Sequence, residues 1–368
     1  MSALDSIHIL DFSRVLAGPL ATMVLGDLGA TVTKVERVGI GDDTRSWGPP
    51  YDERGTATYF LSVNRNKESV ALDLADAADR ARARELASSA DVVVENFRPG
   101  TMERLGLGYE QLARERPQLV YCSITGFGRG AGAELPGYDL LVQAVGGLMS
   151  ITGPADGPPQ KVGVALVDVV TGLFAAVGIL AAVRHRERTG EGQRVDVDLL
   201  SCLLAALVNQ GSAYTAAGVV PRRMGNGHPS IAPYDLYATS DGDLVLAVGN
   251  DRQFAALCAE LGCPELADDP RFASNDARVG SRDALRAALE QRLRAAPAAA
   301  WAQRLLAAGV PAGEVNDVAG AFALAERLGL EPVSEIPRTD GSTVRVPANP
   351  IRLSRTPAAY GQPPPELG

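Results

Sequence analysis

Histidine and cysteine are scarce in this chain, which has three histidines and four cysteines among 368 residues. The histidines (His8, His185 and His228) lie far apart, no H-E-x-x-H motif occurs, and Cys258 and Cys263 have no second cysteine pair. The spacing therefore does not predict a zinc site, and we expect no bound metal. Four cysteines in so long a chain also do not make a disulfide framework.

Positive charge is in deficit as well. Lys and Arg number 35 against 44 Asp and Glu, which gives a formal net charge of −9. This balance disfavours a nucleic-acid-binding protein. The first ten residues have neither a cationic region nor a long apolar run, so a secretory signal is not expected and a reducing cytoplasm is the default location. G-x-S-x-G and Walker A motifs are also missing, which disfavours an ordinary serine hydrolase and a P-loop enzyme.

What the chain has is the composition of a soluble globular protein, 46% hydrophobic and 21% charged, long enough for about two domains. Short apolar runs alternate with helical patterns through the first third of the chain. The predicted strands are 7–11, 31–36, 92–95 and 119–124, and the predicted helices are 20–28, 79–87 and 110–115. This alternation predicts an α/β fold with a parallel sheet and crossover helices.

A second, smaller unit follows a linker-like stretch, 213–224. Two short strands flank a hairpin turn at 239–242, and three helical patterns come next, at 253–261, 281–293 and 298–307. This order predicts a small α+β domain over 213–310. Residues 315–368 show few helical patterns and two short strands, near 333–336 and 343–346.

Residues 162–183 form an apolar run without Lys, Arg or Glu, long enough to span a bilayer. In an otherwise soluble chain we expect a core helix rather than a transmembrane one. Its single charge is Asp168, which the pattern places at or just before a helix N-terminus. The simplest interpretation is a helix cap. A carboxylate in so dry a neighbourhood is, however, costly and nucleophilic, so Asp168 is the candidate catalytic residue.

Several loops that follow the predicted strands carry arginines: Arg14, Arg37, Arg98 and, nearby, Arg104. In parallel sheets ligands bind beyond the carboxyl ends of the strands. A positive rim there suits a phosphorylated or carboxylated ligand, and ordinary surface ion pairs explain the same residues equally well. Residues 126–131 fit the dinucleotide pattern G-x-G-x-x-A, but glycines and a proline follow where a helix must open, so a nicotinamide site is not favoured.

Taken together, ordered segments of the chain resemble the family III coenzyme A transferases of the CaiB/BaiF type, which also include α-methylacyl-CoA racemases. The matching segments are 4–19, 29–45, 64–67 with 72–74, 91–106, 137–140, Asp168 with its helix and the RTGEGQRVDVDLL stretch, and 225–234. The resemblance implies a Rossmann-like large domain built from 1–212 and 311–368, a small inserted domain over 213–310, and an interlocked homodimer. From the net charge and the core-helix interpretation of 162–183 we expect neither a nucleic-acid nor a membrane partner.

The resemblance also implies the chemistry. Asp168 matches the catalytic aspartate, which would form an aspartyl anhydride and then an aspartyl-CoA thioester. An acyl-CoA, with succinyl-CoA as the suggested donor, and a small carboxylic or dicarboxylic acid would be the substrates, with no permanently bound cofactor. The implied CoA contacts are Arg14, Val15, Arg37, Leu72, Asn96, Phe97, Arg104, Tyr138 and Asp139. The loop Gly225, Asn226, Gly227 and His228 is either a turn or a segment that closes over an intermediate.

Three departures from the family pattern matter. Ala75 stands where some members have a basic residue, which weakens one implied phosphate contact. Tyr138 and Asn250 stand where the racemases have a histidine and a glutamate. The racemase activity therefore remains the alternative, and CoA transfer is the leading hypothesis.

Overall fold

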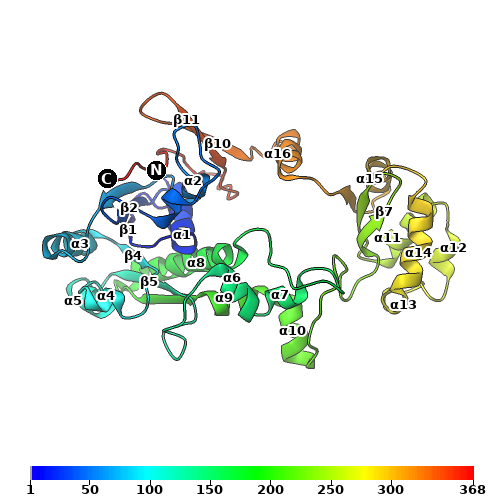
Figure 1. Ribbon diagram of the computed structural model, residues 1–368, viewed down its shortest axis with the longest axis horizontal. Coiled ribbons are helices and arrows are strands. Elements are labelled where there is room, and N and C mark those ends of the chain that lie inside the picture. Colours follow the sequence, from blue (N-terminus) through cyan, green and yellow to red (C-terminus); the bar gives the residue numbers. More distant parts are fainter. Residues whose placement is uncertain (1) are drawn as a thin grey trace. The chain divides into compact units, whose positions relative to one another are not determined.

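A computed structural model describes residues 2–368, and the chain divides into two units (Figure 1). The large unit comprises the described residues up to Leu148, Lys161–Val220 and Leu330–Gly368. The small unit comprises Met149–Gln160 and Pro221–Gly329. The large unit is thus assembled from three separate stretches of chain.

A six-stranded parallel sheet forms the centre of the large unit, in the order β3-β2-β1-β4-β5-β6. Its strands are β1 (His8–Asp11), β2 (Thr31–Glu36), β3 (Glu68–Ala71), β4 (Val92–Glu95), β5 (Val120–Thr125) and β6 (Arg194–Asp198). The predicted α/β class and parallel sheet are confirmed. The strand order reverses between β1 and β4, which is where doubly wound folds place their ligands.

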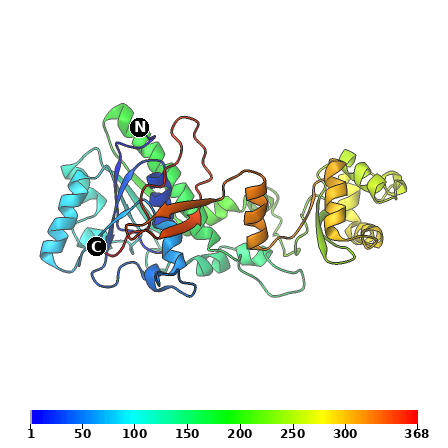
Figure 2. The ribbon, with the colours of Figure 1, turned by 90° about the horizontal axis from the view of Figure 1, so that it is seen from above.

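Helices cover both faces of this sheet (Figure 2). Along β4, Val92 and Val94 pack on one face and Val93 on the other, because successive strand side chains point to opposite sides. The first face is covered by α1 (Ala17–Asp27), α8 (Leu166–Thr189) and α9 (Leu199–Ala206). The second is covered by α3 (Ala77–Ser89), α4 (Thr101–Arg104) and α5 (Tyr109–Glu115).

The apolar run of the sequence lies in α8, which packs against α1, α9, β5 and β6. This helix is long and apolar enough to cross a membrane. The helices α9 and α10 (Val208–Ala217), which meet at an angle of 85°, meet the same criterion if they are counted as one span. Core helices meet the same criterion. Gly172 lies against α1: a Cβ atom there would be 2.6 Å from the carbonyl oxygen of Ala17. The glycine therefore lets the two helices approach closely, one turn after Asp168.

The remaining elements of the large unit lie mainly in its connections. They are the 3₁₀ helix η1 (Asp43–Ser46), α2 (Thr58–Val63), α6 (Asp139–Val145) and α10, with the four-residue helix α7 (Leu148–Ile151) where the first stretch ends. The antiparallel hairpin β10 (Val333–Pro337) and β11 (Thr343–Pro347) packs on Leu61 of α2. The two predicted C-terminal strands are therefore present and belong to the large unit.

The small unit contains an antiparallel sheet in the order β7-β8-β9, with strands Tyr234–Ala238, Asp243–Ala247 and Ala312–Glu314. Its helices are α11 (Asp251–Glu260), α12 (Glu265–Asp268), α13 (Asn275–Gly280), α14 (Arg282–Leu293), α15 (Ala298–Ala307) and α16 (Val318–Arg327). The strands and the helices α11 to α15 enclose a separate hydrophobic core, to which α16 contributes no buried residue.

The boundaries differ from those that the sequence suggested. The predicted linker 213–224 begins inside α10, which has no buried residue in the single chain and so gives no clear apolar pattern. The return to the large unit comes at Leu330 rather than at residue 311, because β9 pairs with β8 in the small sheet. Residues 149–160 also leave the large unit, which the sequence did not indicate.

Candidate active site

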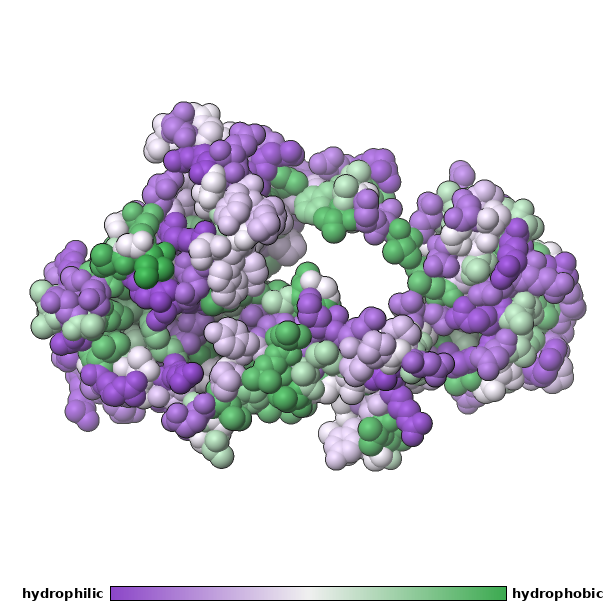
Figure 3. Space-filling view, viewed as in Figure 1, coloured by the Kyte–Doolittle hydropathy of each residue, from purple (hydrophilic) through white to green (hydrophobic). Residues whose placement is uncertain are grey.

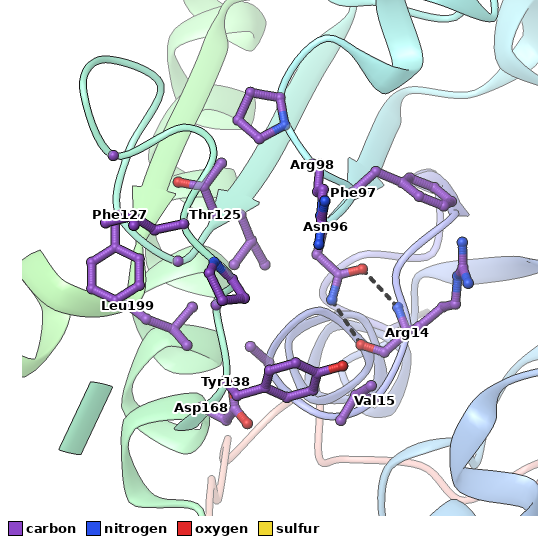
Figure 4. A pocket seen from close by; sticks show the side chains of 18 of the residues that line it. Arg14, Val15, Asn96, Phe97, Arg98, Thr125, Phe127, Tyr138, Asp168 and Leu199 are labelled. Carbon is purple, nitrogen blue, oxygen red and sulfur yellow. Dashed lines mark hydrogen bonds between the residues drawn. The ribbon is translucent and has the colours of Figure 1, made fainter. Parts of the chain in front are cut away.

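Two cavities lie at the carboxyl edge of the large sheet. The first, of about 330 Å³, is lined by the segments after β1, β4 and β5 and by Asp168 (Figure 4). The second, of about 720 Å³, is lined by the segments after β1, β2 and β3. Arg14 and Phe97 line both. The pair of cavities therefore straddles the position between β1 and β4 where the strand order reverses.

Asp168 lies in the first turn of α8 and faces the first cavity (Figure 4). The sequence predicted it at or just before the helix start, and the helix begins two residues earlier, at Leu166. Asp168 is not the cap of this helix. No side chain among residues 2–368 donates a hydrogen bond to its carboxylate, which leaves both oxygens available to a ligand.

The surroundings of Asp168 are dry. Val15, Leu16, Tyr59, Ala165 and Val169 belong to one apolar cluster beside it. Burial, and after it the negative charge of Asp139, raise the pKa of Asp168 to about 7. A group that is half ionised near neutral pH and poorly solvated when ionised is suited to nucleophilic attack.

Asp139 organises the start of α8 instead of facing the cavity. Its Oδ1 accepts hydrogen bonds from the backbone N–H of Val167 at 2.8 Å and of Asp168 at 3.3 Å. Its Oδ2 accepts a bond of 2.6 Å from Gln143, whose own Oε1 accepts one from the N–H of Val162 at 2.9 Å. Asp139, implied as a CoA contact, is thus engaged with the helix that carries Asp168. Gln143, fully buried, was missed from the sequence.

Two glycines in contact shape the loop that leads to Tyr138. A Cβ atom on Gly126 would lie 2.4 Å from the Cα of Gly137, so the loop closes on itself there. The G-x-G-x-x-A stretch continues into turns, and the next helix is α6, starting at Asp139. The expectation that no helix opens after this motif is confirmed. Tyr138, 64% exposed, lines the first cavity, with its ring between Asp168 and Val15 (Figure 4).

Asn96 lines the first cavity, but its carboxamide is occupied. Its Oδ1 accepts the N–H of Arg14 at 2.9 Å, and its Nδ2 donates to the carbonyl oxygen of Arg14 at 2.7 Å (Figure 4). Both polar atoms of the side chain are thus used to hold the main chain after β1. The CoA contact implied by the family resemblance stays a prediction, and in the structure the carboxamide positions the main chain of Arg14.

The second cavity combines cations with apolar side chains. Leu72 and Phe97 line it together with Arg37 and Arg14, whose guanidinium lies 4.5 Å from the centre of the Phe97 ring. Arg37 is also ion-paired with Asp43, so part of the positive rim is neutralised within the chain. Arg104, of the implied set of CoA contacts, lines neither cavity and donates to Thr101 at 3.1 Å. Ala75, one of the departures from the family pattern, lines the second cavity without a charge.

The glycine-bearing loop lies in the small unit. Gly225 has a φ of +62°, and its N–H donates to the carbonyl oxygen of Gly153. Asn226 is exposed, Gly227 lies beside Asp235, and His228 contacts the ring of Tyr234. Arg282 donates hydrogen bonds to the carbonyl oxygens of His228 and Pro229, at 2.6 and 2.9 Å. The segment is a turn held at its C-terminal end, and its closing over an intermediate stays a prediction.

Sequence reasoning missed an aromatic pair near the nucleophile. Burial, together with the charges of Asp168, Asp139 and Asp42, raises the pKa of Tyr59 in α2, and the ring of Tyr59 packs edge-on against Trp47 at 5.5 Å. The one feature of the sequence that could have pointed to this pair is the cluster of aromatic residues and prolines at 47–51, which ends eight residues before Tyr59. Its contact with the site depends on tertiary packing that no local pattern contains.

The CoA-transferase family III model matches residues 4–368. The chain belongs to this family. It is 44% identical to the mouse succinyl-CoA:glutarate CoA-transferase over 100% of this chain and 84% of that protein. It is also 44% identical to the acetyl-CoA:oxalate CoA-transferase of Acetobacter aceti, over 95% of this chain and 89% of that protein. A CaiB/BaiF family crystal structure from Brucella suis matches with a TM-score of 0.88 and 44% identity, covering 100% and 96% of the chains.

The resemblance identified from the sequence is therefore confirmed, and the chain is a family III CoA-transferase. No group of three or more His, Cys, Asp or Glu side chains suited to a metal ion occurs within the part of the chain that the structure describes. Asn250, at the position of the racemase glutamate, has a structural role here: its side chain accepts the N–H of Gln253 and caps α11.

Proposed function

We propose that this family III CoA-transferase moves CoA from an acyl-CoA to a small dicarboxylic acid through covalent intermediates on Asp168. One observation carries the proposal: the Asp168 carboxylate, which accepts no hydrogen bond from residues 2–368, faces a cavity at the carboxyl edge of the sheet, in apolar surroundings. The substrate class is supported by relatives named for succinyl-CoA with glutarate, acetyl-CoA with oxalate and succinyl-CoA with mesaconate.

In the first half-reaction, an oxygen of ionised Asp168 attacks the thioester carbonyl carbon of the donor. The C–S bond breaks, CoA leaves as the thiolate, and a mixed anhydride joins Asp168 to the donor acyl group. The thiolate then attacks the aspartyl carbonyl carbon, and the donor acid leaves as its carboxylate. The product is an aspartyl-CoA thioester. Covalent catalysis thus divides one difficult exchange into easier steps.

In the second half-reaction, the acceptor carboxylate attacks the aspartyl thioester and releases the CoA thiolate again. The new anhydride joins Asp168 to the acceptor acyl group. Attack of the thiolate on that acyl carbonyl gives the new acyl-CoA and restores the Asp168 carboxylate. No water, oxidant or net proton is consumed, and the dry surroundings of Asp168 protect both intermediates from hydrolysis.

The two cavities suit the two ends of an acyl-CoA. We assign the thioester to the first cavity, beside Asp168, and the adenine and its phosphates to the second, where Leu72, Phe97 and Arg37 offer apolar surface and charge. Arg14, which lines both, lies where the connecting chain must pass. Guanidinium groups suit phosphate oxygens, and a stacked aromatic ring suits adenine.

The glycine-bearing loop 225–228 belongs to the same proposal as a segment that shields the intermediate. Glycines at two of its four positions allow backbone to approach a ligand closely. The homodimer is likewise proposed, and apolar side chains exposed on α8 support it: Leu173, Phe174 and Val177 are 48, 45 and 63% exposed in the single chain.

The test is transfer itself. Protein is incubated with succinyl-CoA and, in turn, glutarate, oxalate and mesaconate, and new CoA thioesters are measured by chromatography with mass detection. A new thioester with at least one acid, abolished in Asp168→Ala, is expected. The matched control is Asp198→Asn, since Asp198 ends β6 at the same edge and caps α9 without lining either cavity. Deuterium entering the α-carbon of a branched acyl-CoA from solvent, without transfer, would favour the racemase instead.

A further inference from the structure

The main chain of residues 13–15, between β1 and α1, is fixed by side chains at nearly every polar atom. The N–H of Ser13 donates to Asp11 at 2.9 Å, and its carbonyl oxygen accepts from the Nζ of Lys34 at 2.8 Å. Asn96 holds both the N–H and the carbonyl oxygen of Arg14. This segment forms the wall of the first cavity that faces Tyr138 and Asp168 (Figure 4).

Val15 has a backbone conformation that its side chain disfavours. Its φ is +69°, in the left-handed region, where a β-branched residue is an outlier. Such conformations persist only where the surroundings hold them, and they gather at functional sites. The contact that holds Val15 in this conformation is with Asp42: the backbone nitrogen of Val15 donates to the Asp42 carboxylate and lies 3.3 Å from each of its oxygens.

Asp42 is itself held by a buried ion pair. Its Oδ2 lies 2.9 Å from the Nζ of Lys34, and both side chains have no exposed surface. Its Oδ1 accepts the N–H and the hydroxyl of Thr44, at 3.0 and 2.7 Å. Lys34 therefore bridges the carbonyl of Ser13 and the carboxylate that holds Val15. One cation within β2 thus connects residues 13–15 with the loop that carries Asp42.

A buried ion pair of this kind contributes little to stability relative to apolar residues of similar size, because desolvation offsets the attraction. Its geometric effect is larger. With Lys34 and Asp42 in place, the peptide groups at 13–15 have one arrangement, and Arg14 and Val15 present their side chains to the cavity in a fixed register. Without the pair, Val15 can relax to negative φ and turn the wall away from Asp168.

We propose that Lys34 and Asp42 are positioning residues for the reaction: their ion pair holds Val15 in the left-handed conformation and so fixes the cavity wall opposite the nucleophile. The inference rests on the proposed function, since it concerns the rate of acyl transfer at Asp168. Neither residue touches substrate. Both act through the main chain of residues 13–15.

The experiment is a double-mutant cycle between Asp42 and Val15, read as kcat and KM for the acyl-CoA. Asp42→Asn leaves an acceptor but weakens the pair, and we expect kcat to fall about 10- to 100-fold, as small displacements in an active site do. KM is expected to change by less than about threefold, because Arg14 is the one residue of segment 13–15 that lines the second cavity, and the segments after β2 and β3 form most of its lining. Glycine adopts positive φ without strain. In the Val15→Gly background, Asp42→Asn is therefore expected to lower kcat by less than about threefold.

Two further variants separate positioning from stability. A single change at Lys34 or Asp42 leaves the other charge of the pair buried and unpaired. The double variant, Lys34→Met with Asp42→Asn, removes both charges, so we expect it to fold. The control is Asp27→Asn, because Asp27 is equally buried and ion-paired with Arg65 at 2.6 Å, at the far end of α1. We expect this control to lower the melting temperature without changing kcat of the folded protein.

Equal losses of kcat for Asp42→Asn in the wild-type and Val15→Gly backgrounds would overturn the inference, as would full activity in the folded double variant. Wild-type protein that transfers no CoA from any thioester would instead overturn the proposed function. The two failures are therefore distinguished by the first measurement of the series, the wild-type rate.

Discussion

Asp139 binds the backbone of Asp168, the proposed nucleophile: its Oδ1 accepts the N–H of Asp168 at 3.3 Å. The same carboxylate caps the first turn of α8 and raises the pKa of its neighbour through its charge. Position and ionisation of Asp168 are thus set by one side chain, in addition to burial. This relationship leads to the first prediction.

Asp139→Asn keeps a hydrogen-bond acceptor and removes the charge. Asp168 attacks as a carboxylate, so the rate of transfer is expected to rise with pH through its pKa, about 7. Without the second negative charge that pKa falls, and the rising limb of the pH–kcat/KM profile moves to lower pH. Burial, the larger cause, remains, so the limb stays above the usual range of an aspartate. An unchanged profile in Asp139→Asn would contradict this account.

The free energy of unfolding should also depend on pH through the buried carboxyl of Asp168. A carboxyl whose pKa is raised by folding destabilises the native state increasingly as pH rises from about 4 to about 7. Asp168→Asn removes that penalty. We expect a gain of about 1–3 kcal/mol in the free energy of unfolding at pH 8 and little gain near pH 4. Urea denaturation at the two pH values measures it, with Asp198→Asn as the control.

Asn96 is expected to act on geometry. Asn96→Ala leaves the N–H and the carbonyl of Arg14 without their partner, at a cost of about 1–3 kcal/mol in stability. Because Arg14 lines both cavities, kcat/KM for the acyl-CoA should fall at least tenfold in the folded variant. Steady-state kinetics with thermal melts gives both numbers. A stable variant with wild-type kcat/KM would show that Asn96 does not position Arg14.

The exposed face of α8 provides a test of the dimer. Phe174 and Val177 lie three residues apart and therefore on one side of the helix. Burial of this face in a second chain predicts a dimer in light scattering after gel filtration, and Phe174→Glu with Val177→Glu should shift it toward the monomer. Figure 3 shows further apolar surface over α6 and α9, where Leu140, Val145 and Leu204 are exposed. A wild-type monomer at micromolar concentration contradicts the proposal.

The sequence predicted the parts of the fold that depend on local pattern. The strands at 7–11, 92–95 and 119–124 have apolar runs and the strand at 31–36 is rich in β-branched residues, and each is present within one or two residues. Asp168 stood out because it is the single charge in an apolar stretch. The family resemblance added the fold and the activity, which the comparisons confirm.

What the sequence left out depends on contacts between distant residues. The family resemblance implied Asn96 as a CoA contact, and only the folded structure shows that its carboxamide is bonded to the main chain of Arg14. Lys34 lies in a strand and Asp42 in a loop, and no local pattern indicates that they form a buried ion pair. The unit boundary at Leu330 depends on the pairing of β9 with β8, which has no local signal.

The most direct test of the central claim is mass spectrometry of the protein mixed with an acyl-CoA. The account predicts an adduct of CoA or of the acyl group on Asp168, removed by hydroxylamine and absent from Asp168→Ala. Asp198→Asn should retain it. Full CoA transfer by Asp168→Ala, or an adduct confined to another residue, would contradict the account.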